Sequence, residues 1–93
     1  MAARIDVEEG KPGSFEVTVR EGATRTTHTV TVDPEYARSL GGDADHAALV
    51  RRSFEFLLER ESKESILSSF ALPVIGRYFP EYEREIRRRL AGA

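Results

Sequence analysis

The sequence predicts an α+β domain, in which an N-terminal antiparallel β-hairpin packs on a central helix and short C-terminal helices follow. Three observations support this prediction: apolar and polar residues alternate over 14–32, a broad apolar arc spans 46–60, and proline and glycine interrupt the chain after residue 62. A chain of 93 residues has the length of one domain and can bury one modest core. We therefore expect a single domain over 1–93.

The central element of this prediction is the segment 46–60, HAALVRRSFEFLLER. On a helix its apolar side chains fill an arc of about 200°, roughly twice the stripe of an ordinary surface helix. Charged side chains occupy most of the remaining surface. Because such a helix needs cover on two sides, we expect the hairpin on one flank and the C-terminal helices on the other.

The hairpin is indicated by period-two alternation over 14–20 and again over 27–32, with a turn at 21–23 between them. This pattern is typical of antiparallel strands with one buried and one exposed face. Ile5 and Val7 alternate with charged residues in the same way, but a clear break follows at 8–13. Two interpretations stay open: a first strand over 4–7, which would make a three-stranded meander, or a flexible tail over 1–13.

Start and stop signals define the helices. Asp33 suits an N-cap and Pro34 the first helical position, so a short helix begins there and ends at the Gly41-Gly42 pair. Asp43 or Asp45 then caps the central helix. Further along, the sequence predicts one or two helical turns at 63–70, a short helix or 3₁₀ turn at 73–79, and a last helix that opens at Pro80.

Residues with catalytic or metal-binding chemistry are few. Asp43, Asp45 and His46 lie together, but they stand where a helix cap belongs, and His28 shares a strand face with Val30 and Val32. The serines have no triad context, no glycine pattern matches a phosphate loop, and the chain has no cysteine. We therefore expect no catalytic site, no metal and no cofactor.

An aromatic and apolar cluster precedes the last helix. It includes Tyr78, Phe79 and Tyr82, close to Leu72, Val74 and Ile75. Aromatic side chains are enriched at protein interfaces, and they also complete hydrophobic cores. The sequence leaves both interpretations open, an interface for a partner or for self-association, or a cap over the central helix.

Positive charge is concentrated in the last helix. Arg84, Arg87 and Arg88 are candidates for contact with an anion or with nucleic acid. The alternative is that arginines in the last turn complement the helix dipole, together with glutamates of the same helix. The formal net charge of −2 argues against broad affinity for nucleic acid.

One partial resemblance covers residues 27–60, through the strand THTVTV, its run into DPEYARSL, the break GGDAD and the apolar helix LVRRSFEFLLE. This segment resembles the strand–helix–helix unit of the ribbon–helix–helix DNA-binding proteins, which include many bacterial antitoxins and repressors. The resemblance implies that two chains pair their strands into a ribbon. It also implies that the outward residues enter the major groove of DNA: Arg25, Thr27, Thr29 and Thr31.

Together these observations predict a small, bacterial-type, non-enzymatic protein of the cytoplasm that acts by binding a protein partner or a second copy of itself. No stretch approaches the roughly 18 apolar residues of a membrane span, and the N-terminus lacks the apolar run of a signal peptide. The alternative is a ribbon–helix–helix-like transcriptional regulator or antitoxin, which would be a dimer.

Overall fold

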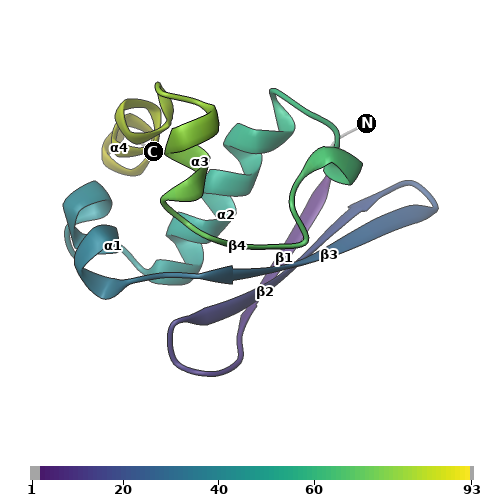
Figure 1. Cartoon of the computed structure of the whole chain (residues 1–93), viewed down its shortest axis with the longest axis horizontal. Coiled ribbons are helices and arrows are strands. Elements are labelled where there is room, and N and C mark those ends of the chain that lie inside the picture. The colour runs from purple at the N-terminus through teal and green to yellow at the C-terminus, as the bar shows by residue number, and fades with distance from the viewer. Residues whose placement is uncertain (1–2, 93) are drawn as a thin grey trace.

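The computed structural model describes residues 3–92 and has a four-stranded sheet with helices packed against it (Figure 1). This confirms the predicted α+β class with a central helix and short C-terminal helices. The elements in chain order are β1 (Arg4–Glu9), β2 (Ser14–Glu21), β3 (Thr24–Thr31), α1 (Pro34–Gly41), α2 (His46–Leu58), the 3₁₀ turn η1 (Lys63–Ser65), β4 (Ser69–Ala71), α3 (Val74–Tyr78) and α4 (Tyr82–Gly92).

The sheet has the strand order β1-β2-β3-β4, with the first three strands antiparallel to their neighbours. The predicted hairpin is confirmed, and β3 begins at Thr24 because a tight turn through Gly22, whose φ is 59°, joins the two strands. Of the two interpretations of the N-terminal segment, the strand is correct over 4–9. Residues 1–2 of the suggested tail lie outside the described residues.

The prediction of helical turns over 63–70 is wrong for most of that segment. Only Lys63–Ser65 forms a 3₁₀ turn, and Ser69–Ala71 forms β4, parallel to β3. The amide of Thr29 donates to the Ser68 carbonyl at 2.8 Å, and the amide of Leu72 donates to the Thr31 carbonyl at 3.0 Å. Hydrogen bonding to β3 thus decides the conformation of this short apolar run, because the spacing of its apolar residues alone fits a helix or a strand.

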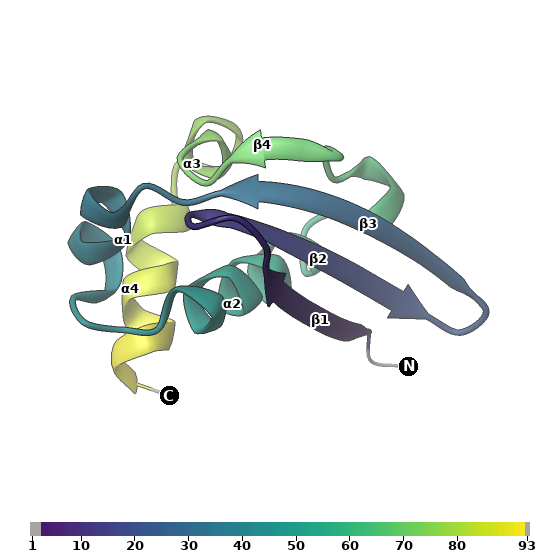
Figure 2. The ribbon, with the colours of Figure 1, turned by 90° about the horizontal axis from the view of Figure 1, so that it is seen from below.

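Helix α2 is covered on two sides, as its apolar arc predicted. The Phe54 ring packs against His28 of β3 and Phe70 of β4, with ring centroids 5.3 and 6.1 Å apart. Two residues further on, Phe56 points the opposite way and packs against Phe79 and Tyr82. Figure 2 shows α2 beneath the sheet, with α4 crossing it on the side away from the strands.

Side-chain caps and a glycine set the helix boundaries. Asp33 accepts from the amide of Glu35 at the start of α1, and Asp45, not Asp43, accepts from the amide of Ala48 at the start of α2. Gly42, at a φ of 61°, ends α1. Helix α2 ends at Leu58, two residues short of the predicted end, and α4 begins at Tyr82, two residues after Pro80.

Candidate functional site

An apolar groove of about 490 Å³ lies between α3, the end of α2 and the segment that leads from η1 into β4. Eight of its ten lining residues are apolar or aromatic, and the other two are Glu61 and Ser65. The apolar members are Leu57, Ile66, Leu67, Phe70, Val74, Ile75, Tyr78 and Phe79. Such a composition suits apolar side chains of a ligand or partner.

The rim of this groove is exposed to an unusual degree. Leu67 is 47% exposed and Tyr78 is 67% exposed, and they are the exposed large hydrophobic residues within 3–92. Both line the same groove, Leu67 from the segment between η1 and β4 and Tyr78 from α3. Large apolar side chains that gather at one place on a surface typically mark a binding site.

Two polar contacts hold the segment that carries Leu67. The His28 ring is buried, and its Nδ1 donates to the Leu67 carbonyl at 2.8 Å while its Nε2 lies 2.8 Å from the Thr26 hydroxyl. The buried Lys63 ammonium bridges Glu21, the last residue of β2, and Glu64, at 3.1 and 2.7 Å. His28 therefore positions one lip of the groove from inside the sheet.

The three residues of the predicted aromatic cluster occupy different positions. Tyr78 stands at the exposed rim of the groove, and Phe79 lies half-buried in its wall with its ring edge-on to Phe56. Tyr82 is fully buried, so the core interpretation holds for this residue. The interface interpretation is left to Tyr78 and Phe79.

The buried Tyr82 is part of a closed hydrogen-bond chain. Its hydroxyl lies 2.6 Å from the Ser53 hydroxyl, which in turn donates to the Leu49 carbonyl at 2.8 Å. Burial raises the pKa of the Tyr82 phenol well above its usual value, so the group stays protonated. This chain ties α4 to α2 and offers no group to a ligand.

The predicted arginine cluster is largely occupied by partners of its own chain. Arg88 donates to both carboxylate oxygens of Glu85, at 2.8 and 2.6 Å. Arg87 donates to the Ser39 carbonyl at 3.2 Å and lies 4.0 Å from Glu83, while Arg84 is exposed. Pairing with glutamates reduces the field that these arginines offer to an anion.

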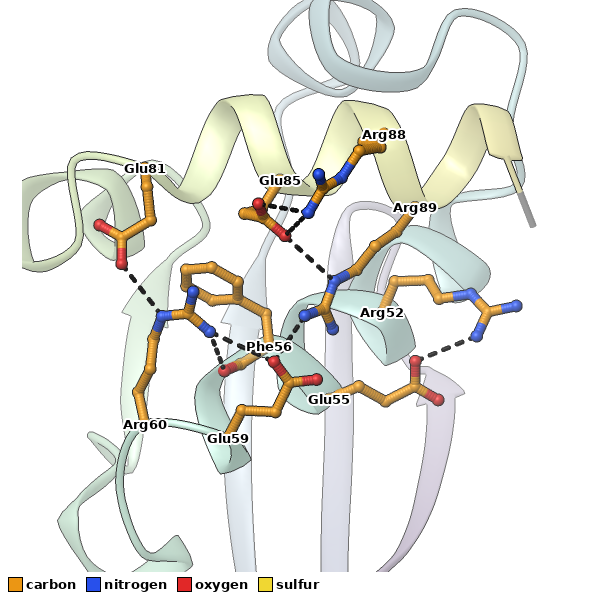
Figure 3. Close-up of polar contacts among 9 residues, drawn as sticks. All are labelled: Arg52, Glu55, Phe56, Glu59, Arg60, Glu81, Glu85, Arg88 and Arg89. Atoms are coloured by element: carbon orange, nitrogen blue, oxygen red, sulfur yellow. Dashed lines mark hydrogen bonds and ion pairs between the residues drawn. The ribbon is translucent and has the colours of Figure 1, made fainter.

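Two further arginines, Arg60 and Arg89, cover the ring of Phe56 (Figure 3). The guanidinium carbon of Arg60 stands 3.7 Å from the ring centroid, and that of Arg89 stands 5.7 Å away. Arg60 pairs with Glu81 at 3.1 Å, and Arg89 pairs with Glu59 at 2.6 Å. The arrangement clamps α4 onto α2 through charge and cation–π contacts.

The residues that the ribbon–helix–helix resemblance singled out lie on the open face of the sheet. Arg25, Thr27, Thr29 and Thr31 are all exposed. However, β3 pairs with β2 on one side and with β4 on the other within the same chain. A ribbon shared by two chains would require one of these strands to move away from β3.

The remaining sequence candidates lie at the start of α2 and in the turn before it. Asp45 caps α2, as described above, and Asp43 is exposed. Within the described part of the chain, no group of three histidine, cysteine, aspartate or glutamate residues could hold a metal ion. No helix over the same residues is long and apolar enough to cross a membrane.

Most of the groove could not be predicted from local sequence patterns. Its walls combine Leu57 from α2 with Ile66, Leu67 and Phe70, which the sequence placed on a helical segment. Their common surface depends on β4, and no local pattern signals a parallel strand that returns to β3. Comparisons of the chain with protein-family models, with curated proteins and with solved structures gave no match.

Proposed function

We propose that this protein is a non-enzymatic interaction module that binds a protein partner at the groove beside α3. The observation that carries the proposal is that Leu67 and Tyr78, both large and exposed, flank one apolar groove. Removing such side chains from water on binding stabilises a complex, and tyrosine is a frequent hot-spot residue.

The lining favours binding over catalysis. Glu61 is the one carboxylate among the lining residues, and neither histidine, lysine nor cysteine stands beside it there. General acid–base or nucleophilic chemistry needs a second group within hydrogen-bond reach. A chain without cysteine also suits a reducing compartment, and we place the protein in the cytoplasm on that ground.

The test uses two surface variants and a matched control. Tyr78→Ala and Leu67→Asp remove the groove rim, whereas Thr29→Ala alters an exposed residue on the opposite face of the sheet. The tagged chain captures partners from its native host, and the affinity of each purified partner is then measured. We expect both rim variants to weaken binding by roughly tenfold or more, as for hot-spot residues, and the control to leave it unchanged.

The outcome is decided by the pattern across variants. The proposal is contradicted if a partner binds both rim variants, Tyr78→Ala and Leu67→Asp, as tightly as it binds the unaltered chain. A partner lost only with Thr29→Ala would instead assign binding to the exposed face of the sheet that the ribbon–helix–helix resemblance singled out. Light scattering of the same proteins reports self-association, and a dimer that dissociates with Tyr78→Ala would identify the partner as a second copy.

A further inference from the structure

The outer edge of β4 carries backbone groups that face away from the sheet. In the parallel ladder, the Ser68 carbonyl and the Leu72 amide bond to β3. Because backbone groups alternate in direction along a strand, those of Ser69 and Ala71 point outward. Figure 2 shows no other strand or helix beside β4 on the side away from β3.

The opposite edge of the sheet is better protected. On β1 the Arg51 guanidinium donates to the Ile5 carbonyl, so a side chain of α2 covers part of that edge. Natural proteins block exposed edges in this way to prevent pairing with other chains. Within residues 3–92, no side chain donates to or accepts from the backbone groups of Ser69 or Ala71 in a comparable way.

The groove adjoins this open edge. Phe70 of β4 lines the groove, and so do Leu67 just before the strand and Val74 just after it. Side chains of a strand alternate between the two faces of its sheet. A strand added beside β4 would therefore direct every second side chain toward the helix-covered face, where the groove lies.

The groove also carries a negative charge that this chain leaves unused. The Glu61 carboxylate has no hydrogen bond or ion pair to another side chain in the part of the chain that the structure describes. The other lining residues are uncharged. A ligand that combines an apolar side chain with a nearby cation would match both features.

We propose that the segment bound here is an extended peptide that adds to the free edge of β4, with an apolar side chain in the groove and a basic side chain beside Glu61. This inference rests on the proposed function and specifies the form of the partner. The backbone of Ser69 and Ala71 supplies hydrogen bonds, and the groove supplies selectivity, as in other cases of strand addition.

The experiment starts from random peptides displayed on phage and selected on the full chain. One selected peptide is synthesised in three forms, unmodified and with backbone N-methyl groups on either of the two alternating sets of residues. Only one set donates to β4, so we expect one methylated form to lose roughly tenfold or more in affinity and the other to bind nearly as the parent does. Exchange of the Ser69 and Ala71 amides with solvent should slow when the unmodified peptide binds.

The charge is tested with Glu61→Gln and Glu61→Lys. We expect Glu61→Gln to lower the affinity for a peptide that carries lysine or arginine severalfold. The second should weaken it further and admit the same peptide with aspartate in place of its basic residue. Equal binding of both peptides to all three proteins overturns the assigned role of Glu61.

The outcomes separate this inference from the proposed function. Peptides that lose binding with Tyr78→Ala, yet leave the Ser69 and Ala71 amides in free exchange and tolerate both methylation patterns, overturn strand addition but leave the groove as the interaction site. Amide protection that rises with the concentration of the chain alone assigns the edge to a second copy and overturns the peptide. The inference is also overturned if the selection yields no peptide whose binding depends on the groove residues. Capture of a partner from the host tests the proposed function separately.

Discussion

The hydroxyl groups of Tyr82 and Ser53 depend on each other. Since the Ser53 proton goes to the Leu49 carbonyl, the Tyr82 phenol donates the hydrogen bond between them, at 2.6 Å. Both residues are fully buried. Removal of the Ser53 hydroxyl leaves the buried Tyr82 donor without an acceptor, whereas removal of both hydroxyls leaves no such unpaired donor.

We therefore predict a strong coupling in a double-mutant cycle. Ser53→Ala leaves the buried Tyr82 phenol without an acceptor and should lower the free energy of unfolding by about 1–3 kcal/mol. Tyr82→Phe should lower it by about 1 kcal/mol. The double variant should cost clearly less than the sum of the two. Urea denaturation of the four proteins measures this, and additive losses would show that the pair contributes as separate groups.

The ion pair of Glu59 leads to a prediction for how the stability of the fold depends on pH. The hydrogen bond from Arg89 holds the pKa of the Glu59 carboxyl below its usual value. A lowered pKa in the folded state stabilises the fold at pH values above the unfolded pKa of about 4.3, and this contribution is lost as the pH falls through the folded value. Because the Glu59 side chain is 55% exposed, its contribution to the free energy of unfolding at neutral pH is at most about 1 kcal/mol.

The measurement compares the unaltered chain with Glu59→Gln by urea denaturation from pH 7 down to pH 3. We expect the unaltered chain to be the more stable at neutral pH and the difference to shrink below about pH 4.3. Glu16→Gln, at an exposed position that forms no ion pair within the described residues, is the control and should differ little from the parent. A difference that grows on acidification would contradict the role of the Arg89 pair.

Among the elements, the antiparallel strands and the longer helices were predictable because their signals are local. Strict alternation marks β2 and β3, and Asp45 with the apolar arc marks α2. The strand β4 was not predictable in the same way. Its three residues, Ser69–Ala71, are held by bonds to β3, about forty residues earlier in the chain, and their own sequence fits a helical turn equally well.

The candidate site was predictable only where one element carries it. The cluster at 78–82 drew attention to the right part of the chain, and Tyr78 does stand exposed on the groove. Spacing could not separate it from Tyr82, four residues later, because the turn between α3 and α4 directs Tyr82 into the core. Glu61 and Leu67 join the same groove through tertiary packing, which a local pattern does not encode.

At the scale of the whole molecule, α2 connects two layers that otherwise touch little. Phe54 faces the sheet and Phe56 faces α3 and α4, and both are fully buried. If these layers form one cooperative unit, loss of either ring should destabilise the whole domain. Phe54→Ala and Phe56→Ala should each cost about 3–5 kcal/mol, a large share of the roughly 5–15 kcal/mol that domains possess.

Hydrogen exchange of backbone amides distinguishes this from independent layers. With one cooperative unit, either variant should lower the protection of β2 and of α4 by the same free energy, since both open only in global unfolding. Phe54→Leu and Phe56→Leu serve as conservative controls and should show the same pattern at smaller size. If Phe56→Ala lowers the protection of α4 while β2 keeps its full protection, α2 joins two parts that unfold separately. A partner bound beside α3 would then stabilise the helical layer alone.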